Sequence, residues 1–181
     1  MKKVCVLLAD GFEETEALAP LDMMRRAKIE VKTVGVTGEF VTGSHGVTVK
    51  ADLKPEEISF NNIDGVVLPG GMPGTVNLGK SETVTKAAVY CAENGKITAA
   101  ICAAPSVLGN LGILKGKKAT CFPGFEKELE GATYTAAPVE IDGNVITGKG
   151  AGCAILFGKA IVEKAVSAEA ANKVCGDMQC P

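Results

Sequence analysis

Short apolar runs alternate along the chain with segments in which apolar residues recur at helical spacing. We predict strands at the apolar runs, over residues 3–9, 30–36, 65–68, 97–101 and 145–147. The first, third and fourth runs are almost wholly apolar, as expected for central strands that are buried on both faces of a sheet. Helical patterns separate several of these strands and cover residues 14–27, 82–94 and 153–166.

This alternation predicts an α/β protein with a doubly wound, mostly parallel sheet sandwiched between helices, in a single domain over residues 1–181. Two turns add antiparallel hairpins, one between residues 40 and 50 and one at Asp142-Gly143-Asn144. Pro20 lies inside the first helical pattern, where it is expected to break or kink the helix. We expect residues 175–181 to form a frayed tail.

Composition removes several classes of function. The net charge is only −2 and the chain has no Trp, so it has neither the basic stripe nor the stacking rings of a nucleic-acid-binding protein. It has no apolar run long enough to cross a membrane. The seven cysteines are scattered, odd in number and without a C-x-x-C pair, which argues against a disulfide framework or a zinc site. We therefore expect a reducing compartment, the cytoplasm.

Cys102 lies where the fourth predicted strand ends and a proline begins a helical pattern, in the run AAICAAP at residues 99–105. A side chain at such a sharp strand-to-helix turn projects from the carboxyl edge of the sheet, and the following helix N-terminus stabilises a thiolate. Most free cysteines are simply buried apolar residues. Because Cys102 combines the turn with the helix, we predict that it is the nucleophile and the one strongly acidified thiol.

The loop after the first predicted strand reaches the same edge and reads DGFEETE at residues 10–16. Its glutamates, Glu13, Glu14 and Glu16, fall at a helix N-terminus, where the ordinary interpretation of each is a solvated first-turn residue. A carboxyl held against a thiol would instead tune the pKa of both groups. The loop is therefore a candidate source of an acid or base for Cys102.

Two glycine-rich loops follow other strands at this edge. In PGGMPG, residues 69–74, backbone N–H groups could approach a ligand and form an oxyanion hole with the N–H of Ala103; a plain tight turn explains the glycines equally well. GKGAG, residues 148–152, lacks the spacing of a dinucleotide fingerprint or a phosphate loop. We therefore expect neither a cofactor nor a metal.

Four motifs together resemble the ThiJ/PfpI superfamily and, more narrowly, its branch of the Parkinson-disease protein deglycase (DJ-one): ADGFEETE, PLDMMRRA, LPGG and AAICAAP, starting at residues 9, 20, 68 and 99. The match runs from about residue 4 to residue 166 in order and spacing. The resemblance implies a flavodoxin-like fold. It makes Cys102 the oxidation-prone nucleophile, Glu16 the carboxylic acid that hydrogen-bonds to it, and the N–H groups of Gly71 and Ala103 the oxyanion donors.

The resemblance also implies a homodimer. Apolar residues spread widely around the first predicted helix, which suggests burial on more than the core face: Leu18, Leu21, Met23 and Met24.

The sequence departs from the branch at one position near the cysteine. Where the branch commonly places a histidine before a proline, this chain reads Thr120-Cys121-Phe122-Pro123, so Phe122 occupies the histidine position. The single histidine, His45, lies in a Gly-rich turn and is interpreted as an exposed turn imidazole. A Cys–His dyad is therefore not expected, and a peptidase is the least favoured function, because amide cleavage needs a proton donor for the leaving amine.

Without that histidine, Glu16 is the predicted general acid and base, and two classes of function remain. In the first, Cys102 adds to a methylglyoxal-type aldehyde or a glycated substrate, and Glu16 moves a proton between adjacent carbons, as in a cofactor-free glyoxalase or deglycase. In the second, peroxide oxidises Cys102 to a sulfinate that hydrogen bonds stabilise, as in a redox sensor or stress chaperone. We rank the enzyme first, and the two are compatible.

Overall fold

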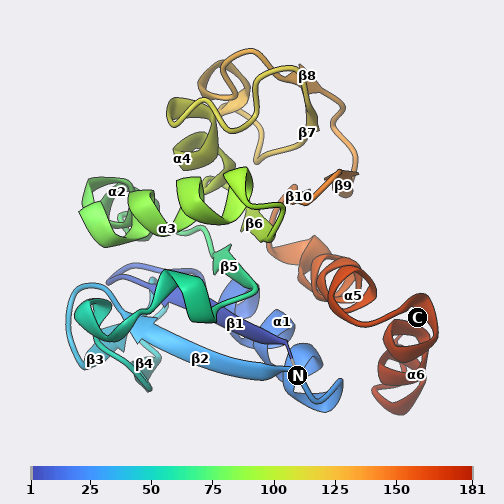
Figure 1. The fold of residues 1–181 in the computed structure, drawn as a ribbon. Helices are drawn as coiled ribbons and strands as arrows, with labels where there is room; N and C mark the ends of the chain where they lie inside the picture. Colours follow the sequence, from blue (N-terminus) through green and yellow to red (C-terminus); the bar gives the residue numbers. More distant parts are fainter. Residues whose placement is uncertain (1, 181) are drawn as a thin grey trace.

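A six-stranded sheet runs through the molecule in the strand order β2-β1-β5-β6-β10-β9 (Figure 1). The computed structural model describes residues 2–180. Every neighbouring pair is parallel except β9 and β10, which form an antiparallel hairpin at one edge. The predicted α/β class and the mostly parallel sheet are confirmed. The strands of this sheet are β1 (Lys3–Leu8), β2 (Glu30–Gly35), β5 (Gly65–Leu68), β6 (Ile97–Ile101), β9 (Val139–Asp142) and β10 (Val145–Gly148).

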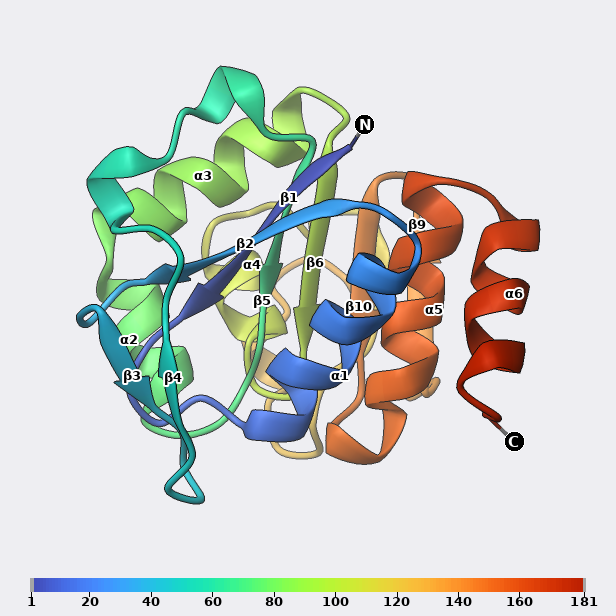
Figure 2. The same ribbon diagram turned by 90° about the horizontal axis from the view of Figure 1, so that it is seen from below.

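Helices cover both faces of this sheet (Figure 2). One layer is α1 (Glu14–Arg26), α5 (Ala154–Ala165) and α6 (Ala168–Asp177), and the other is α2 (Gly74–Lys80), α3 (Glu82–Glu93) and α4 (Pro105–Asn110). The alternation of side chains along each strand divides the core in two. In β1, Val4, Val6 and Leu8 pack toward the first layer, whereas Cys5 and Leu7 pack toward the second.

Smaller elements lie outside the sheet. The predicted hairpin between residues 40 and 50 is present as β3 (Phe40–Thr42) and β4 (Thr48–Lys50), which pair antiparallel. Sequence reasoning missed a short parallel pair, β7 (Lys118–Ala119) and β8 (Thr133–Tyr134). It also missed four single turns of 3-10 helix: Pro55–Glu57, Phe60–Asn62, Glu126–Glu128 and Ala151–Cys153.

The structure corrects two expectations about helices, the break at Pro20 and the frayed tail. Pro20 does not break α1, which runs continuously through it. Helices α1 and α5 pack closely at Pro20, since a Cβ on Gly158 of α5 would lie only 3.0 Å from the Cα of Pro20. The expected frayed tail from residue 175 is not present, because residues 175–177 belong to α6. This helix packs on α5 and buries Ala171 and Val174. Residue 181 lies outside the described residues.

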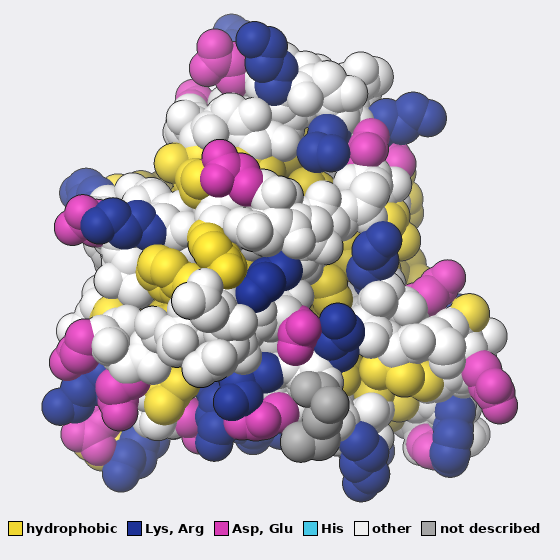
Figure 3. Space-filling view, viewed as in Figure 1, with side chains coloured by type: hydrophobic (Ala, Val, Ile, Leu, Met, Phe, Trp, Pro, Cys, Tyr) yellow, Lys and Arg dark blue, Asp and Glu magenta, His cyan; other side chains and the backbone are white. Residues whose placement is uncertain are grey.

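The surface carries both signs of charge. On the face shown in Figure 3, Lys and Arg side chains are interspersed with Asp and Glu side chains. Within residues 2–180, no helix combines the length and the apolar character that a membrane span requires.

Candidate active site

Cys102 occupies the turn that follows β6 and precedes α4. Its backbone lies in the left-handed region, with a φ of 65°, which a non-glycine residue adopts only where its surroundings impose it. Those surroundings are hydrogen bonds on both sides: the Cys102 N–H donates to the Gly148 carbonyl at 2.9 Å, and the Phe122 N–H donates to the Cys102 carbonyl at 2.8 Å. The predicted elbow is therefore present, and its half-buried thiol is held in a fixed position.

The Glu16 carboxyl meets this thiol from the first turn of α1. Its side chain is fully buried, and its Oε2 accepts a hydrogen bond from the Gly70 N–H at 2.9 Å. Its Oε1 is also buried and has no nitrogen or oxygen partner within residues 2–180. The carboxyl is hydrogen-bonded to the Cys102 thiol, so the structure brings together the two groups that the sequence paired.

The glycine loop after β5 closes the other side of the thiol. A Cβ on Gly70 would lie 2.7 Å from the Cβ of Cys102, so only glycine permits this approach. Gly71 has a φ of +88°, and its N–H, like that of Ala103, hydrogen-bonds to the thiol. All four predicted site residues therefore converge, while the role of the two N–H groups as oxyanion donors stays a prediction.

The prediction that Cys102 is an acidified thiol is wrong. Burial, together with the charge of the Glu16 carboxylate and a hydrogen bond to it, raises the pKa of Cys102 to about 12, despite the N–H groups of Ala103 and Gly71. Burial likewise raises the pKa of Glu16 to about 7. Sequence reasoning weighed the helix N-terminus but not the loss of hydration, which dominates here. The two groups titrate as a pair that holds a single negative charge above neutral pH.

This coupling gives Cys102 a distinctive pH dependence. We expect its alkylation rate to rise as the pH approaches about 7 and then to level off, because the pair loses its first proton near pH 7 and its second near pH 12. Between these values a constant fraction of pairs carries the charge on sulfur. Iodoacetamide labelling of Cys102, followed by peptide mapping, measures the profile. A single rise near the pKa of a free thiol, about 8.5, would contradict the coupling.

Other thiols offer an internal comparison in that experiment. Burial raises the pKa of Cys5, Cys91 and Cys121 to about 11, 12 and 11, respectively, without a carboxyl partner as close as Glu16. All three are buried, so they should stay unlabelled while the protein is folded. Labelling of Cys121 as fast as that of Cys102 would show that the wrong nucleophile had been assigned.

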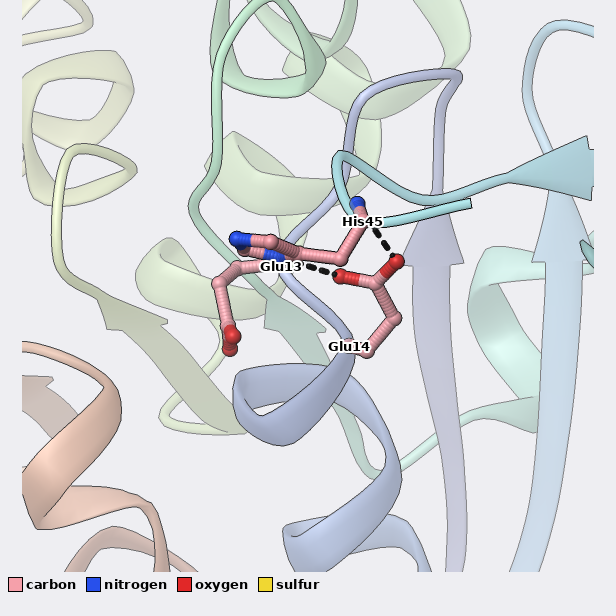
Figure 4. A group of neighbouring side chains, drawn as sticks. All are labelled: Glu13, Glu14 and His45. Carbon is pink, nitrogen blue, oxygen red and sulfur yellow. Dashed lines mark hydrogen bonds and ion pairs between the residues drawn. The ribbon is translucent and has the colours of Figure 1, made fainter. Parts of the chain in front are cut away.

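Glu14 and His45 form a second contact at this edge (Figure 4). Glu14 is mostly buried, and its carboxylate accepts from the His45 N–H at 2.8 Å and lies 2.9 Å from the ring Nδ1. Burial raises the pKa of Glu14, but the hydrogen bonds from the ring and from backbone N–H groups outweigh it and lower the pKa to about 2. The interpretation of Glu14 as a solvated residue is therefore wrong, and the carboxylate anchors the turn between β3 and β4.

Glu13 completes this group. Its Oε2 accepts from the Glu16 N–H at 2.7 Å and caps α1, while its own N–H donates to the Gly70 carbonyl at 3.0 Å. Glu13, Glu14 and His45 offer ligand atoms within 4.8 Å of one another, but the Glu14 oxygens already hold the turn. No local sequence pattern indicates that Glu14 pairs with a histidine 31 positions later.

The family model described as the DJ-1/PfpI family matches residues 2–164. The chain belongs to this family.

Curated members of the DJ-1/PfpI family include relatives of different lengths. The Parkinson disease protein 7 homolog of Danio rerio is 38% identical over 180 residues, covering 96% of this chain and 94% of the relative. Protein DJ-1 homolog B of Arabidopsis thaliana is 36% identical and covers 98% of this chain, but this chain spans only 41% of that longer protein. A deglycase of Pyrococcus abyssi is 33% identical over 150 residues, covering 81% of this chain and 89% of the relative.

Solved structures of DJ-1/PfpI proteins share the whole fold. Oxidized Toxoplasma gondii DJ-1 gives a TM-score of 0.95 at 33% identity and covers 99% of this chain and 98% of its own. A mutant of a DJ-1 superfamily protein from Salmonella typhimurium gives a TM-score of 0.94 at 35% identity, with complete coverage of both chains. The flavodoxin-like arrangement predicted here from the family resemblance is thus the arrangement of the family's solved structures.

Phe122, which stands where a histidine was expected from the resemblance, lies between Cys102 and Gly150. Its N–H donates to the Cys102 carbonyl, so the backbone of Phe122 lies next to the elbow. Its ring is about half exposed and lies against Gly150, where a Cβ would be 3.3 Å from the ring. This DJ-1/PfpI protein therefore presents an aromatic ring beside the elbow where the branch commonly has an imidazole.

Proposed function

We propose that the protein is a cofactor-independent enzyme that uses Cys102 to process methylglyoxal-type aldehydes, as a glyoxalase or deglycase does. One observation carries this proposal: the fully buried Glu16 carboxyl has a pKa of about 7 and is hydrogen-bonded to a thiol that is held in a strained elbow. A carboxyl that titrates near neutral pH can both accept and return a proton during turnover. The deglycase name of the Pyrococcus abyssi relative supports a reaction of this class.

The proposed reaction balances within these groups. Cys102 sulfur adds to the aldehyde carbon of methylglyoxal, and the oxygen of the resulting hemithioacetal takes the proton of the pair. The Glu16 carboxylate then removes the hydrogen on that carbon, which gives an enediolate, and returns this proton to the neighbouring carbon, while the hydroxyl proton moves from the former aldehyde oxygen to the former ketone oxygen. The product is a thioester of lactate and Cys102, which water hydrolyses to lactate and the free thiol. The N–H groups of Gly71 and Ala103 would stabilise the negative oxygen in the addition and hydrolysis steps.

Lactate formation tests the proposal directly. We expect the protein to convert methylglyoxal to lactate without added thiol or metal and the Cys102→Ala variant to form none, as measured by enzymatic lactate assay. Intact mass of the peptide that holds Cys102, after methylglyoxal and after peroxide in parallel, separates turnover from oxidation. A stable adduct on Cys102 without lactate would exclude the enzyme.

A second candidate function is a redox sensor or stress chaperone that acts through oxidation of Cys102. The thiol is only half-buried, and two N–H groups and a carboxyl with a pKa of about 7 surround it. These donors would stabilise a sulfinate, in which each oxygen accepts hydrogen bonds. In this function peroxide converts Cys102 to the sulfinate while aldehyde leaves it unchanged, an outcome that the same mass measurement detects.

Phe122 is expected to limit the hydrolytic activity of Cys102, because it cannot donate a proton. Phe122→His should raise any esterase or aldehyde activity, because an imidazole beside the elbow supplies a proton donor for a leaving group. Peroxide sensitivity of Cys102 should change only modestly, because sulfinate formation uses the Glu16, Gly71 and Ala103 donors instead. Steady-state ester hydrolysis and the rate of sulfinate formation measure the two effects. Peptide hydrolysis through Cys102 in the unmodified protein would mean that another proton donor serves the site.

A homodimer in the cytoplasm completes the proposal. The breadth of apolar residues on α1 does not support the dimer, because Leu21, Met23 and Met24 are buried in this chain's own core. Support comes instead from large apolar side chains that stay exposed, including Phe40 and Leu156. Seven free cysteines are consistent with a reducing compartment. We expect sedimentation velocity at micromolar concentration to give twice the mass of the chain, and a monomer would count against the dimer.

A further inference from the structure

The end of α6 brings two cysteines together that sequence analysis had assigned to a frayed tail. The helix ends at Asp177, and Gln179 then adopts a left-handed conformation with a φ of 55°. The Cys180 N–H donates to the Cys175 carbonyl at 2.9 Å, and the Gln179 N–H donates to the Gly176 carbonyl at 3.1 Å. These two hydrogen bonds define a Schellman motif, in which the side chains at the positions of Cys175 and Cys180 regularly contact each other.

The geometry of this motif suits a cross-link. Standard bond lengths and the hydrogen bond between the two backbones keep the Cα atoms of Cys175 and Cys180 within about 6.8 Å, inside the range that disulfides span. The two thiols are also hydrogen-bonded to each other, and both residues are only partly buried. Burial and the neighbouring Cys180 thiol raise the pKa of Cys175, and the positive charge of Lys159 on α5 offsets this only in part. A small thiol or disulfide can therefore reach a pair that is already assembled.

We propose that Cys175 and Cys180 are a reversible dithiol–disulfide site, separate from Cys102, that exchanges with low-molecular-weight disulfides. One cysteine thiolate attacks a sulfur of the small disulfide, forming a mixed disulfide and releasing one small thiolate. The second cysteine attacks the protein sulfur of that mixed disulfide, forms the Cys175–Cys180 bond and releases the second small thiol. The two cysteines lose two electrons, the small disulfide gains them, and the two protons leave with the released thiols.

Peptide mapping of the intact protein tests this directly. Trypsin cleaves after Lys173, and the remaining peptide, residues 174–181, holds both cysteines and no other thiol. The native protein is equilibrated with mixtures of reduced and oxidised glutathione, quenched with acid, alkylated and digested. We expect this peptide to carry an internal disulfide, at a level at least about tenfold above that of the same protein equilibrated in guanidinium chloride. A glutathione adduct, or equal levels in both conditions, would overturn the proposal.

Two variants separate the effect of the helix end from mere closeness in sequence. Gln179→Pro keeps both thiols but cannot adopt a positive φ or donate its N–H, so it removes the Schellman motif. We expect about a tenfold loss of the internal disulfide in this variant, and an unchanged level would refute the geometric argument. Cys180→Ser removes the resolving thiol and should leave only a glutathione adduct on Cys175. Circular dichroism of both variants confirms that the fold is retained.

Discussion

Replacing Glu16 with glutamine is expected to abolish aldehyde turnover while making the protein more stable above neutral pH. The amide can still accept the Gly70 hydrogen bond, but it cannot take a proton from carbon and return it. General acid–base catalysis contributes about 100- to 10,000-fold, and we expect a loss in kcat of that size. Steady-state lactate formation measures it. A variant that retained more than about a tenth of kcat would place the base elsewhere.

The gain in stability follows from the pKa of Glu16. Its value in the folded protein, about 7, lies above its ordinary value of 4.5, so folding favours the neutral carboxyl. The stability that this neutral form contributes is fully present below pH 4.5 and is lost as the pH rises through about 7. Glutamine carries no charge at any pH, so Glu16→Gln should raise the free energy of unfolding by about 3 kcal/mol at pH 8 and by almost nothing at pH 4. Urea unfolding at the two pH values measures the difference.

Glu13→Gln is the matched control for both effects. Glu13 lies on the same turn and also ends in a carboxyl, but its Oε2 accepts from the Glu16 N–H as a helix cap and does not face the thiol. Its loss of charge should cost about 0.3 to 1 kcal/mol through the helix dipole and leave turnover nearly unchanged. Equal losses of activity in Glu13→Gln and Glu16→Gln would contradict a specific catalytic role for Glu16.

Gly70→Ala is expected to disable the site by a steric route. The added Cβ would lie 2.6 Å from Glu16 Oε2, 2.7 Å from Cys102 Cβ and 2.9 Å from the Ile101 carbonyl. None of these atoms can move without breaking the elbow or the hydrogen bond that Gly70 donates to Glu16. We expect a loss of about 1 to 3 kcal/mol in the free energy of unfolding and about 100-fold in kcat.

Gly152→Ala is the control for the steric argument. Gly152 lies near the same edge of the sheet, but a Cβ there would meet no atom within 4 Å. Its unfolding midpoint and kcat should stay close to those of the unmodified protein. If Gly70→Ala were as well tolerated as Gly152→Ala, the close packing of the glycine loop against Cys102 would be refuted.

The main sheet was predictable because each of its strands leaves a local signal. A run such as residues 97–101 is apolar except for Thr98, and all five of its residues are buried. The β9–β10 hairpin was likewise marked by its Asp-Gly-Asn turn. α6 was missed because it is only ten residues long and its position depends on packing against α5. Pro20 was misjudged for the same reason, since contact with α5 outweighs the local preference of proline.

The site was predictable only as far as topology and the family resemblance extend. The strand-to-helix turn at Cys102 and the glycine loop at Gly70 both lie at carboxyl ends of strands, which a parallel sheet places together. The raised pKa of Cys102 could not be foreseen, because it depends on how deeply Glu16 and the thiol are buried. The contact between Glu14 and His45 joins residues from separate elements and has no trace in local spacing.

The three glutamates at the start of α1 have a consequence for insertions and deletions in this segment. Within one helical turn, Glu13 caps the helix, Glu14 anchors the turn of the β3–β4 hairpin, and Glu16 serves the thiol. Each task depends on the direction in which that position points, and adding one residue rotates every following side chain by about 100°. A single-residue insertion between Glu14 and Glu16 would therefore turn Glu16 away from the thiol while Glu13 and Glu14 kept their positions. Homologous sequences that conserve the site should therefore keep the length of this segment fixed.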